Sequence, residues 1–284
     1  ERSLGWDDPL PRDLEREFRK WLVCLTKASQ LRIPRCTIPS EFGQVKRMEL
    51  HIFCDGAHPA FGCVAYLRVV NQESQVSVRL LIAKNRICPK QGKLTIPRIE
   101  LSSAVLAARV LATLRRELGD CFDEVHLWSD STAVLAYLKN TQTRFHIFLG
   151  NRIQEIRATT SVDQWRHVPG IQNPADVLTR PFNPKEPFGV DHPFYRGPDF
   201  LYNDKSFWPK EGSNFVIEDD DPEIRKEVSN EPDHERRACA TIQQSSEKNL
   251  ENSWFVKYSN LFRLKLHVAA WLRLKDFLLQ KSVN

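Results

Sequence analysis

The chain has 284 residues, of which 41% are hydrophobic and 27% are charged, so it can bury a core of ordinary size. Its 41 lysines and arginines stand against 36 aspartates and glutamates, and this mildly basic balance does not separate a nucleic-acid-binding protein from other enzymes. No apolar run reaches the roughly 20 residues of a membrane span, and no signal-peptide pattern opens the chain. We therefore expect a soluble protein with no membrane contact.

The cysteines indicate a reducing compartment. There are seven of them, an odd number, with no C-x-x-C pair, and most lie within apolar runs. This pattern is typical of reduced, buried thiols. We predict an intracellular protein, cytoplasmic or nuclear, without a structural zinc site. Because the chain begins at Glu1, we also expect it to be part of a longer protein.

Residues 1–46 are predicted to form a connection segment with one amphipathic helix. Between residues 11 and 30, apolar side chains recur at helical spacing on one face: Leu14, Phe18, Trp21, Leu22 and Leu25. This face predicts packing against another part of the protein. Prolines at 34 and 39 then end the helical pattern, which indicates a linker.

Residues 47–183 carry the pattern of a mixed α/β domain. Strands are predicted over residues 48–55, 62–70, 77–85, 125–130 and 164–168. Helices are predicted over residues 97–118, from 131 to 139, over 145–158, and in a last helix that opens at 173–178. Three successive strands followed by alternating helices and strands favour one five-stranded mixed sheet with helices on both faces.

Residues 184–284 are predicted to be a linker followed by a basic helix. The stretch up to residue 210 is rich in proline and aromatic residues, and we expect disorder over about 212–250, where charge dominates and an acidic run occupies 218–221. Helical periodicity returns over 254–281. Because charges interrupt its apolar stripe, we interpret this last helix as a packing element and not as a membrane helix.

Four acidic residues occupy positions that folding alone explains poorly. Asp55 follows the apolar strand 50–54 and precedes Gly56, whereas Asp130 ends the strand 125–129. Glu100 heads the apolar face of its helix, and Asp176 lies in the first turn after an Asn-Pro pair. If the first and fourth strands are parallel neighbours, Asp55 and Asp130 end side by side at one edge of the sheet.

Carboxylates gathered in this way repel one another, and a multivalent cation relieves the repulsion. Mg²⁺ prefers oxygen ligands, and two such ions about 3.5–4 Å apart support hydrolysis of a phosphodiester. The residues therefore predict a site for two Mg²⁺ ions, with Mn²⁺ as a substitute. The alternative is that single acids serve as turn formers or interact with a helix dipole, although Glu100 facing the core has no such simple explanation.

The order and spacing of four segments carry a family resemblance. They are Phe53-Cys54-Asp55-Gly56-Ala57, Ile96-Pro97-Arg98-Ile99-Glu100-Leu101, Leu127-Trp128-Ser129-Asp130-Ser131, and residues 168–176, which end on Asp176. Together they resemble the RNase H domain of the Pol polyprotein of LTR retrotransposons, most closely the BEL/Pao group. The resemblance implies an RNase H-like fold, Asp55, Glu100, Asp130 and Asp176 as catalytic metal ligands, and cleavage of the RNA strand of RNA–DNA hybrids during reverse transcription.

The flanking segments extend this resemblance. Residues 4–11 resemble the stretch that joins reverse transcriptase to RNase H, and residues 197–201 with Trp208-Pro209 resemble the stretch that leads to integrase. The implied partners are those portions of the same polyprotein. One feature departs from the pattern, because the loop before Asp176 offers Ile171 where RNases H usually carry a mobile histidine. His167 lies on a predicted strand, and we do not assign it a catalytic role.

A run of basic residues predicts how the hybrid is held. Between Ser74 and Ile99 there is no acidic residue, but there are six basic ones: Arg79, Lys84, Arg86, Lys90, Lys93 and Arg98. We predict a phosphate-binding surface here and favour Lys84, Arg86 and Arg98, since their segments lead to Glu100. By position alone, Gly56, Ser102 and Asn173 are candidates for contacts with 2′-hydroxyls. Trp128 and Trp165 are predicted to be core residues.

Two other functions compete with a nuclease. A catalytically silent or domesticated copy of the fold would bind nucleic acid or a protein partner without cleaving, but the presence of all four acids argues against it. A transposase or integrase would share the fold, yet such enzymes end their acidic set with a glutamate on a late helix. In this chain the glutamate comes second and an aspartate last.

Overall fold

The computed structural model describes residues 7–28, 32–33, 36–89, 94–180, 192–210, 215–217 and 221–225. Its helices and strands are α1 (Arg12–Ala28), β1 (Val45–Ala57), β2 (Ala60–Asn71), β3 (Val76–Ile87), α2 (Ile96–Leu118), β4 (Glu124–Ser129), α3 (Thr132–Lys139), α4 (Ile147–Thr159), β5 (Trp165–His167) and α5 (Pro193–Arg196). Each predicted strand is present at its predicted place. The predicted helix over 254–281 and most of the predicted disordered stretch lie outside the described residues.

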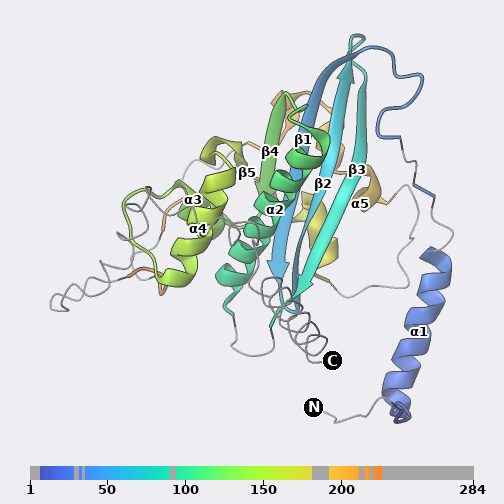
Figure 1. The fold of residues 1–284 in the computed structure, drawn as a ribbon, viewed down its shortest axis with the longest axis vertical. Coiled ribbons are helices and arrows are strands. Elements are labelled where there is room, and N and C mark those ends of the chain that lie inside the picture. The colour runs from blue at the N-terminus through green and yellow to red at the C-terminus, as the bar shows by residue number, and fades with distance from the viewer. Residues whose placement is uncertain are drawn as a thin grey trace, which may run out of the picture. The chain divides into compact units, whose positions relative to one another are not determined.

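The five strands form one mixed sheet in the order β3-β2-β1-β4-β5 (Figure 1). β1 pairs antiparallel with β2, and β2 with β3, whereas β1, β4 and β5 run parallel. In the parallel pair of β1 and β4, Cys54 lies opposite Ser129. The prediction of a five-stranded mixed sheet is confirmed, and so is the parallel neighbourhood of the first and fourth strands.

One face of the sheet is covered by α2, which packs on β1 and β2 (Figure 1). Alternate residues of β1, Leu50, Ile52 and Cys54, point to this side and are fully buried. α2 meets them with an apolar face, and α3 and α4 complete the same layer. Trp165 of β5 is buried in this core as predicted. Burial of this face fixes which residues of β1 point away from α2.

The opposite face of the sheet is covered by residues 193–208. Phe53 of β1 and Trp128 of β4 stack with ring centroids 5.8 Å apart and pack against Phe200 and Trp208. The Tyr66 hydroxyl donates to the carbonyl of Phe194 at 2.6 Å. Helical segments thus lie on both faces, as predicted, and part of the predicted C-terminal linker contributes to the core.

A buried ionic group anchors this second layer. Arg68 of β2 is 1% exposed, pairs with Glu49 at 2.8 Å, and donates to the carbonyls of Leu201 and Asn203. Burial would raise the pKa of Glu49, but a hydrogen bond with His51 and the charge of Arg68 bring it down to about 2. The side chain that neutralises Glu49 therefore also holds residues 201–203 on the sheet.

The last predicted helix of the domain is shorter than expected. The segment opening at Asn173-Pro174 forms a five-residue 3-10 turn, Pro174–Leu178, and not an α-helix. Asn173 caps this turn by accepting a hydrogen bond from the amide of Ala175. The prediction of a helix opening here was therefore wrong beyond one short 3-10 turn. Asp176 is nevertheless in the first turn after the cap.

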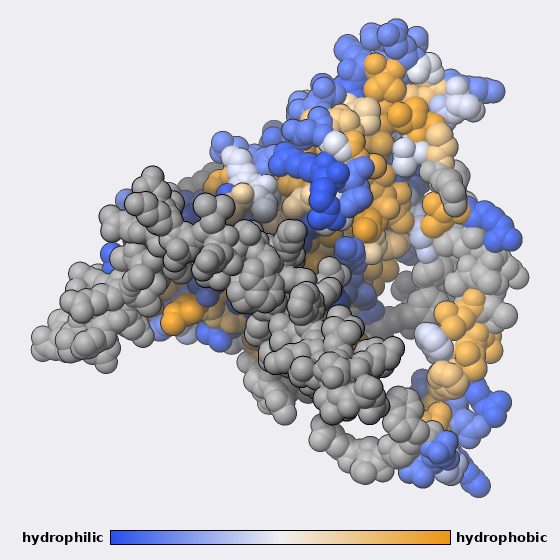
Figure 2. Space-filling model, viewed as in Figure 1, coloured by the Kyte–Doolittle hydropathy of each residue, from blue (hydrophilic) through white to orange (hydrophobic). Residues whose placement is uncertain are grey.

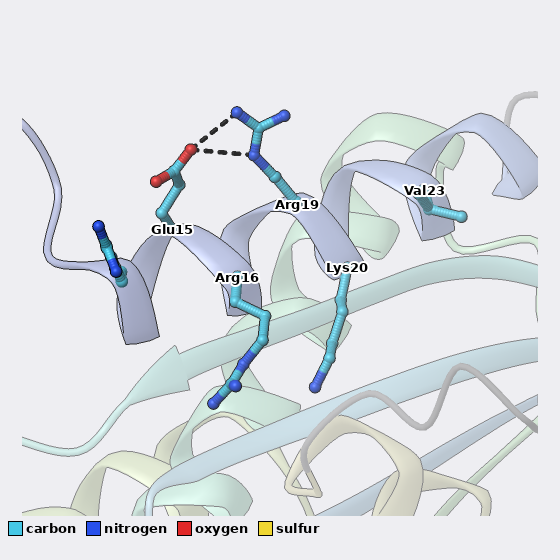
Figure 3. A pocket seen from close by; sticks show the side chains of 6 residues that line it. Glu15, Arg16, Arg19, Lys20 and Val23 are labelled. Carbon is cyan, nitrogen blue, oxygen red and sulfur yellow. Dashed lines mark hydrogen bonds and ion pairs between the residues drawn. The ribbon is translucent and has the colours of Figure 1, made fainter.

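Helix α1 forms over the predicted residues, and its apolar side chains are at the surface (Figure 2). The five residues of the predicted apolar face are 42–49% exposed. The prediction that this face packs on another part of the protein has no support among the described residues. Charged residues of the same helix line a shallow pocket, in which Glu15 pairs with Arg19 (Figure 3). No helix within the described ranges is long and apolar enough to cross a membrane.

Candidate active site

The parallel pairing of β1 and β4 brings two acids together. Since Cys54 lies opposite Ser129, the next residues, Asp55 and Asp130, stand at the same edge of the sheet. Asp55 accepts hydrogen bonds from the amide of Gly56 at 2.7 Å and from the Thr179 hydroxyl at 2.7 Å. Both acids are partly exposed. This is the arrangement that the strand order predicts.

Glu100 joins them because α2 starts directly against the end of β1. A Cβ atom on Gly56 would lie 2.8 Å from the amide nitrogen of Glu100 and 2.8 Å from the carbonyl of Ile99, so only glycine permits this approach. The Ser131 hydroxyl donates to Glu100 Oε2 at 2.7 Å, and Ser131 also caps α3. Thus α2 and α3 both begin at the edge where β1 and β4 end.

Asp176 is tied to the same place by its 3-10 turn. The side-chain amide of Asn173 donates a hydrogen bond to the backbone carbonyl of Cys54 at 3.1 Å, which attaches the turn to β1. The hydroxyl of Thr179, at the end of the turn, donates a hydrogen bond to Asp55. Asp176 itself pairs with Arg180 at 2.8 Å, so one of its near neighbours is a cation. The turn therefore places Asp176 at the same edge of the sheet, within electrostatic reach of Asp130.

Neighbouring negative charges act on two of the acids, Glu100 and Asp130. Burial raises the pKa of Glu100 to about 7, and the negative charges of Asp130 and Asp55 add to the rise, although Ser131 opposes it. Burial likewise raises the pKa of Asp130, assisted by Asp55 and, more weakly, by Asp176, while a hydrogen bond with Asn173 opposes the rise. Every one of the four acids thus takes part in a shared field of negative charge.

This donor set fits divalent cations. It offers carboxylate oxygens only, it is partly open to solvent, and its mutual repulsion would fall on binding positive charge. Among the described residues, no group of three or more His, Cys, Asp or Glu side chains converges closely enough to form a preformed metal site. Hydroxyl groups of Ser131 and Thr179 hold two of the carboxylates instead.

The other predicted site residues divide into three pairs. Lys84 and Arg86 are exposed on the edge strand β3, where they lie opposite Cys63 and Phe61 of β2. Gly56 and Asn173 are buried and serve the close approach of α2 and the turn of Asp176. Lys90 and Lys93 lie outside the described residues. The structure therefore leaves two predicted cations open to a ligand.

The remaining two candidates, Arg98 and Ser102, are engaged within the protein. Arg98 forms a two-bond ion pair with Glu223, at 2.5 and 2.9 Å. The Ser102 hydroxyl donates to the carbonyl of Arg98 at 2.7 Å. Sequence reasoning missed Glu223, Ser131 and Thr179. Only Ser131 carried a signal, since a serine before a helix is a typical N-cap.

The turn before Asp176 has no histidine. Gly170 lies beside Asp130, whose Oδ2 would be 3.4 Å from a Cβ atom at that position, and the next residue, Ile171, is 98% exposed. His167 is partly buried on β5, and its ring centroid lies 6.2 Å from that of Phe215 with the two rings tilted. An exposed apolar side chain therefore occupies this turn.

The strand order, the mixed pairing and the acidic edge define an RNase H-like domain. Residues 1–131 match the family model described as the Pao retrotransposon-like RNaseH-like domain, which covers Asp55, Glu100 and Asp130. The resemblance to the RNase H region of Pao-type retrotransposons is thereby confirmed over this part of the chain.

Solved structures with similarity include RNases H of low sequence identity. RNase H1 from the halophilic archaeon Halobacterium salinarum is 21% identical, over 46% of this chain and 93% of that chain, with a TM-score of 0.31. LC11-RNase H1 in complex with an RNA/DNA hybrid is 14% identical, over 46% and 93%, with a TM-score of 0.32. No curated protein matches. The fold assignment accordingly rests on the strand order and pairing.

Gly56→Ala is expected to damage the site through the fold. The new methyl group would meet backbone atoms of Ile99 and Glu100 at 2.8 Å, so α2 must move away from β1. We expect a loss of about 1–3 kcal/mol in the free energy of unfolding, measured by urea denaturation. Gly150→Ala in α4 is the matched control, since nothing lies within 4 Å there, and it should be neutral or stabilising. Equal effects at both glycines would contradict the close-approach argument.

The raised pKa of Glu100 predicts a pH-dependent stability in the absence of divalent ions. Folded Glu100 keeps its proton up to about pH 7, whereas the unfolded chain releases it near 4.5, so this residue makes the folded state less stable as pH rises through that window. Glu100→Gln removes the effect. In EDTA, we expect the free energy of unfolding of the variant to rise by about 1–3 kcal/mol relative to wild type as the pH increases from 5 to 8. Thermal melting at each pH measures this difference. A difference in stability that does not change with pH would show that folding does not raise the pKa of Glu100.

Proposed function

We propose that this protein hydrolyses the RNA strand of RNA–DNA hybrids endonucleolytically, as part of a retrotransposon Pol protein during reverse transcription. The observation that carries the proposal is the gathering of Asp55, Glu100, Asp130 and Asp176 at the edge where β1 and β4 end. An RNase H-like fold with this acidic edge supports phosphodiester hydrolysis better than it supports a purely structural role. We further propose the reverse transcriptase and integrase portions of the same polyprotein as partners, in the cytoplasm or nucleus.

In this proposal the four carboxylates hold two Mg²⁺ ions, for which Mn²⁺ can substitute. Bound there, the ions would supply Lewis acidity for the attacking water and the leaving oxygen of the scissile phosphodiester. The protein's own contribution is to orient the carboxylates. Ser131 orients Glu100 and Thr179 orients Asp55, each through one hydroxyl hydrogen bond of 2.7 Å. Asn173 holds the turn of Asp176 against β1.

The hybrid would be held by exposed cations beside this edge. Lys84 and Arg86 are two residues apart on β3, so both side chains lie on the same face of the strand, and both are exposed. β3 is the edge strand of the sheet, next to β2, whose pairing partner β1 carries Asp55. Phosphate contacts from these residues predict binding that weakens as the salt concentration rises. Contacts of Gly56, Ser102 and Asn173 with 2′-hydroxyls have no support from exposed side-chain groups.

The proposal is tested by incubating the purified full chain with a labelled RNA–DNA hybrid in Mg²⁺. We expect internal cuts in the RNA strand, none in an all-DNA duplex of the same sequence, and no cutting in EDTA. Hybrid that stays bound but uncut in both Mg²⁺ and Mn²⁺ would favour the silent binding module. Cutting of the all-DNA duplex at the same rate would overturn the assignment of substrate.

A further inference from the structure

A short acidic segment far along the chain is attached beside the candidate active site. Residues 221–225, called the C-terminal strap here, form backbone hydrogen bonds with the segment that connects α3 and α4. The His146 amide donates to the carbonyl of Glu223 at 3.0 Å, and the amide of Arg225 donates to the carbonyl of Arg144 at 2.9 Å. Phe145 and Ile224 form an antiparallel bridge. The strap therefore has a defined position on the domain.

The strap directs one carboxylate at Arg98. Both oxygens of Glu223 accept from the guanidinium, at 2.5 and 2.9 Å, and the Glu223 side chain is only 3% exposed. This parallel two-bond geometry is the one with which arginine recognises phosphate groups. Arg98 lies in the first turn of α2, two residues before Glu100 in the sequence. The strap thus occupies the basic group closest in sequence to the acidic edge.

A second strap contact points to the same location. The Tyr137 hydroxyl of α3 donates to Asp221 at 2.6 Å. Burial raises the pKa of Tyr137, and the negative charges of Asp221, Glu223 and Glu100 raise it further. One hydroxyl is thus within electrostatic reach of both strap acids and of a predicted catalytic acid. The strap consequently adds negative charge to the approach of an anionic substrate.

We propose that the C-terminal strap is an internal competitor of the nucleic acid, with Glu223 standing in for a backbone phosphate on Arg98. The inference rests on the proposed function, because it assumes that a hybrid binds at this edge. Displacement of the strap frees Arg98 for a phosphate and removes two carboxylates from the path of the substrate. Hybrid binding and strap binding to α2 and the α3–α4 connection are then mutually exclusive.

A purely structural role for the pair predicts something different. Arg98 is 32% exposed but Glu223 only 3%, so a structural pair predicts that removing Arg98 leaves a buried carboxylate unpaired and lowers the free energy of unfolding. If the pair only joins the strap to α2, removing the Glu223 charge leaves hybrid affinity unchanged. If the strap competes, the same change tightens hybrid binding. Affinity therefore separates the two roles.

The test measures hybrid affinity in the full chain made non-cleaving by Asp130→Asn. We expect Glu223→Gln in this background to bind the hybrid roughly three- to tenfold more tightly at low salt, and the slope of log affinity against log salt to steepen by about one unit, as for one added phosphate contact. Adding Arg98→Gln should abolish this gain. Arg98→Gln alone should change affinity little, because Arg98 is already occupied.

The matched control is Glu155→Gln. Glu155 forms the same kind of two-bond pair with Arg109 of α2, at 2.5 and 3.0 Å, but further along that helix. We expect unchanged hybrid affinity. Should Glu223→Gln fail to fold, Tyr137→Phe loosens the strap through Asp221 alone and should also tighten binding, by a smaller factor.

The outcomes separate the two hypotheses. If wild type cleaves and the Asp130→Asn protein binds, yet neither strap variant binds more tightly, the competitor role is overturned and the proposed function stands. If wild type does not cleave and no hybrid binds to any variant, the proposed function fails and the strap inference falls with it. Equal tightening by Glu223→Gln and Glu155→Gln would indicate a general charge effect, which also contradicts specific competition at Arg98.

Discussion

Asp130→Asn should abolish RNA cleavage while hybrid binding persists. The substitution keeps the shape of the side chain but removes one charge from the centre of the acidic edge, where Asp130 interacts with both Asp55 and Asp176. We expect the cleavage rate in Mg²⁺ to fall at least about 100-fold, the size of effect seen when one electrostatic contact to a transition state is lost. Binding should change little, since Lys84 and Arg86 are untouched.

The control for this experiment is Asp163→Asn. Asp163 is exposed in the turn that precedes β5, at the opposite end of the parallel strands from Asp130. Cleavage and thermal stability should match wild type. Full activity of Asp130→Asn, measured beside this control, would rule out the acidic edge as the catalytic site.

Trp208→Ala should destabilise the whole domain. Trp208 is 5% exposed, packs edge-on against His51 and His126 of the sheet, and donates its indole N–H to the carbonyl of Asn203. Truncating a buried tryptophan costs about 3–5 kcal/mol, so we expect the melting temperature to fall by roughly 10 °C. Thermal unfolding followed by circular dichroism measures the change.

Phe207→Ala is the neighbouring control, because that side chain is 73% exposed. Its effect should stay within about 0.5 kcal/mol. A small effect of Trp208→Ala as well would mean that residues 193–208 contribute little to the fold. In that case the stable domain would end near residue 183, as the sequence predicts, and would not include residues 193–208.

Local pattern was enough to predict most of the sheet. The middle of β1, residues 50–54, is largely apolar because it is buried from both sides, by α2 on one face and by Phe200 and Trp208 on the other. The two-sided burial is visible in the sequence, but the second covering layer is not. Residues 193–208 carry prolines and short 3-10 turns without helical periodicity, so nothing local marks them as a layer of the core.

The candidate site was predictable as far as it depends on strand ends. Asp55 and Asp130 follow apolar strands, and parallel pairing alone brings them together. Asp176 lies in the first turn after Asn173-Pro174, as expected, although the segment is only a 3-10 turn. The ion pair of Arg98 could not be predicted from the sequence. Its partner, Glu223, lies 125 residues further along the chain, and the run of basic residues around Arg98 by itself favoured a phosphate ligand.

Local sequence pattern was sufficient for the strands, most helices and the acidic residues at the sheet edge, because periodicity and strand-end chemistry act over a few neighbouring residues. Tertiary contacts set which hydroxyl holds each carboxylate, which segment covers the second face, and which cation the strap occupies. Those contacts join residues far apart in the chain, and their choice depends on the geometry with which packed elements approach one another, as at Gly56.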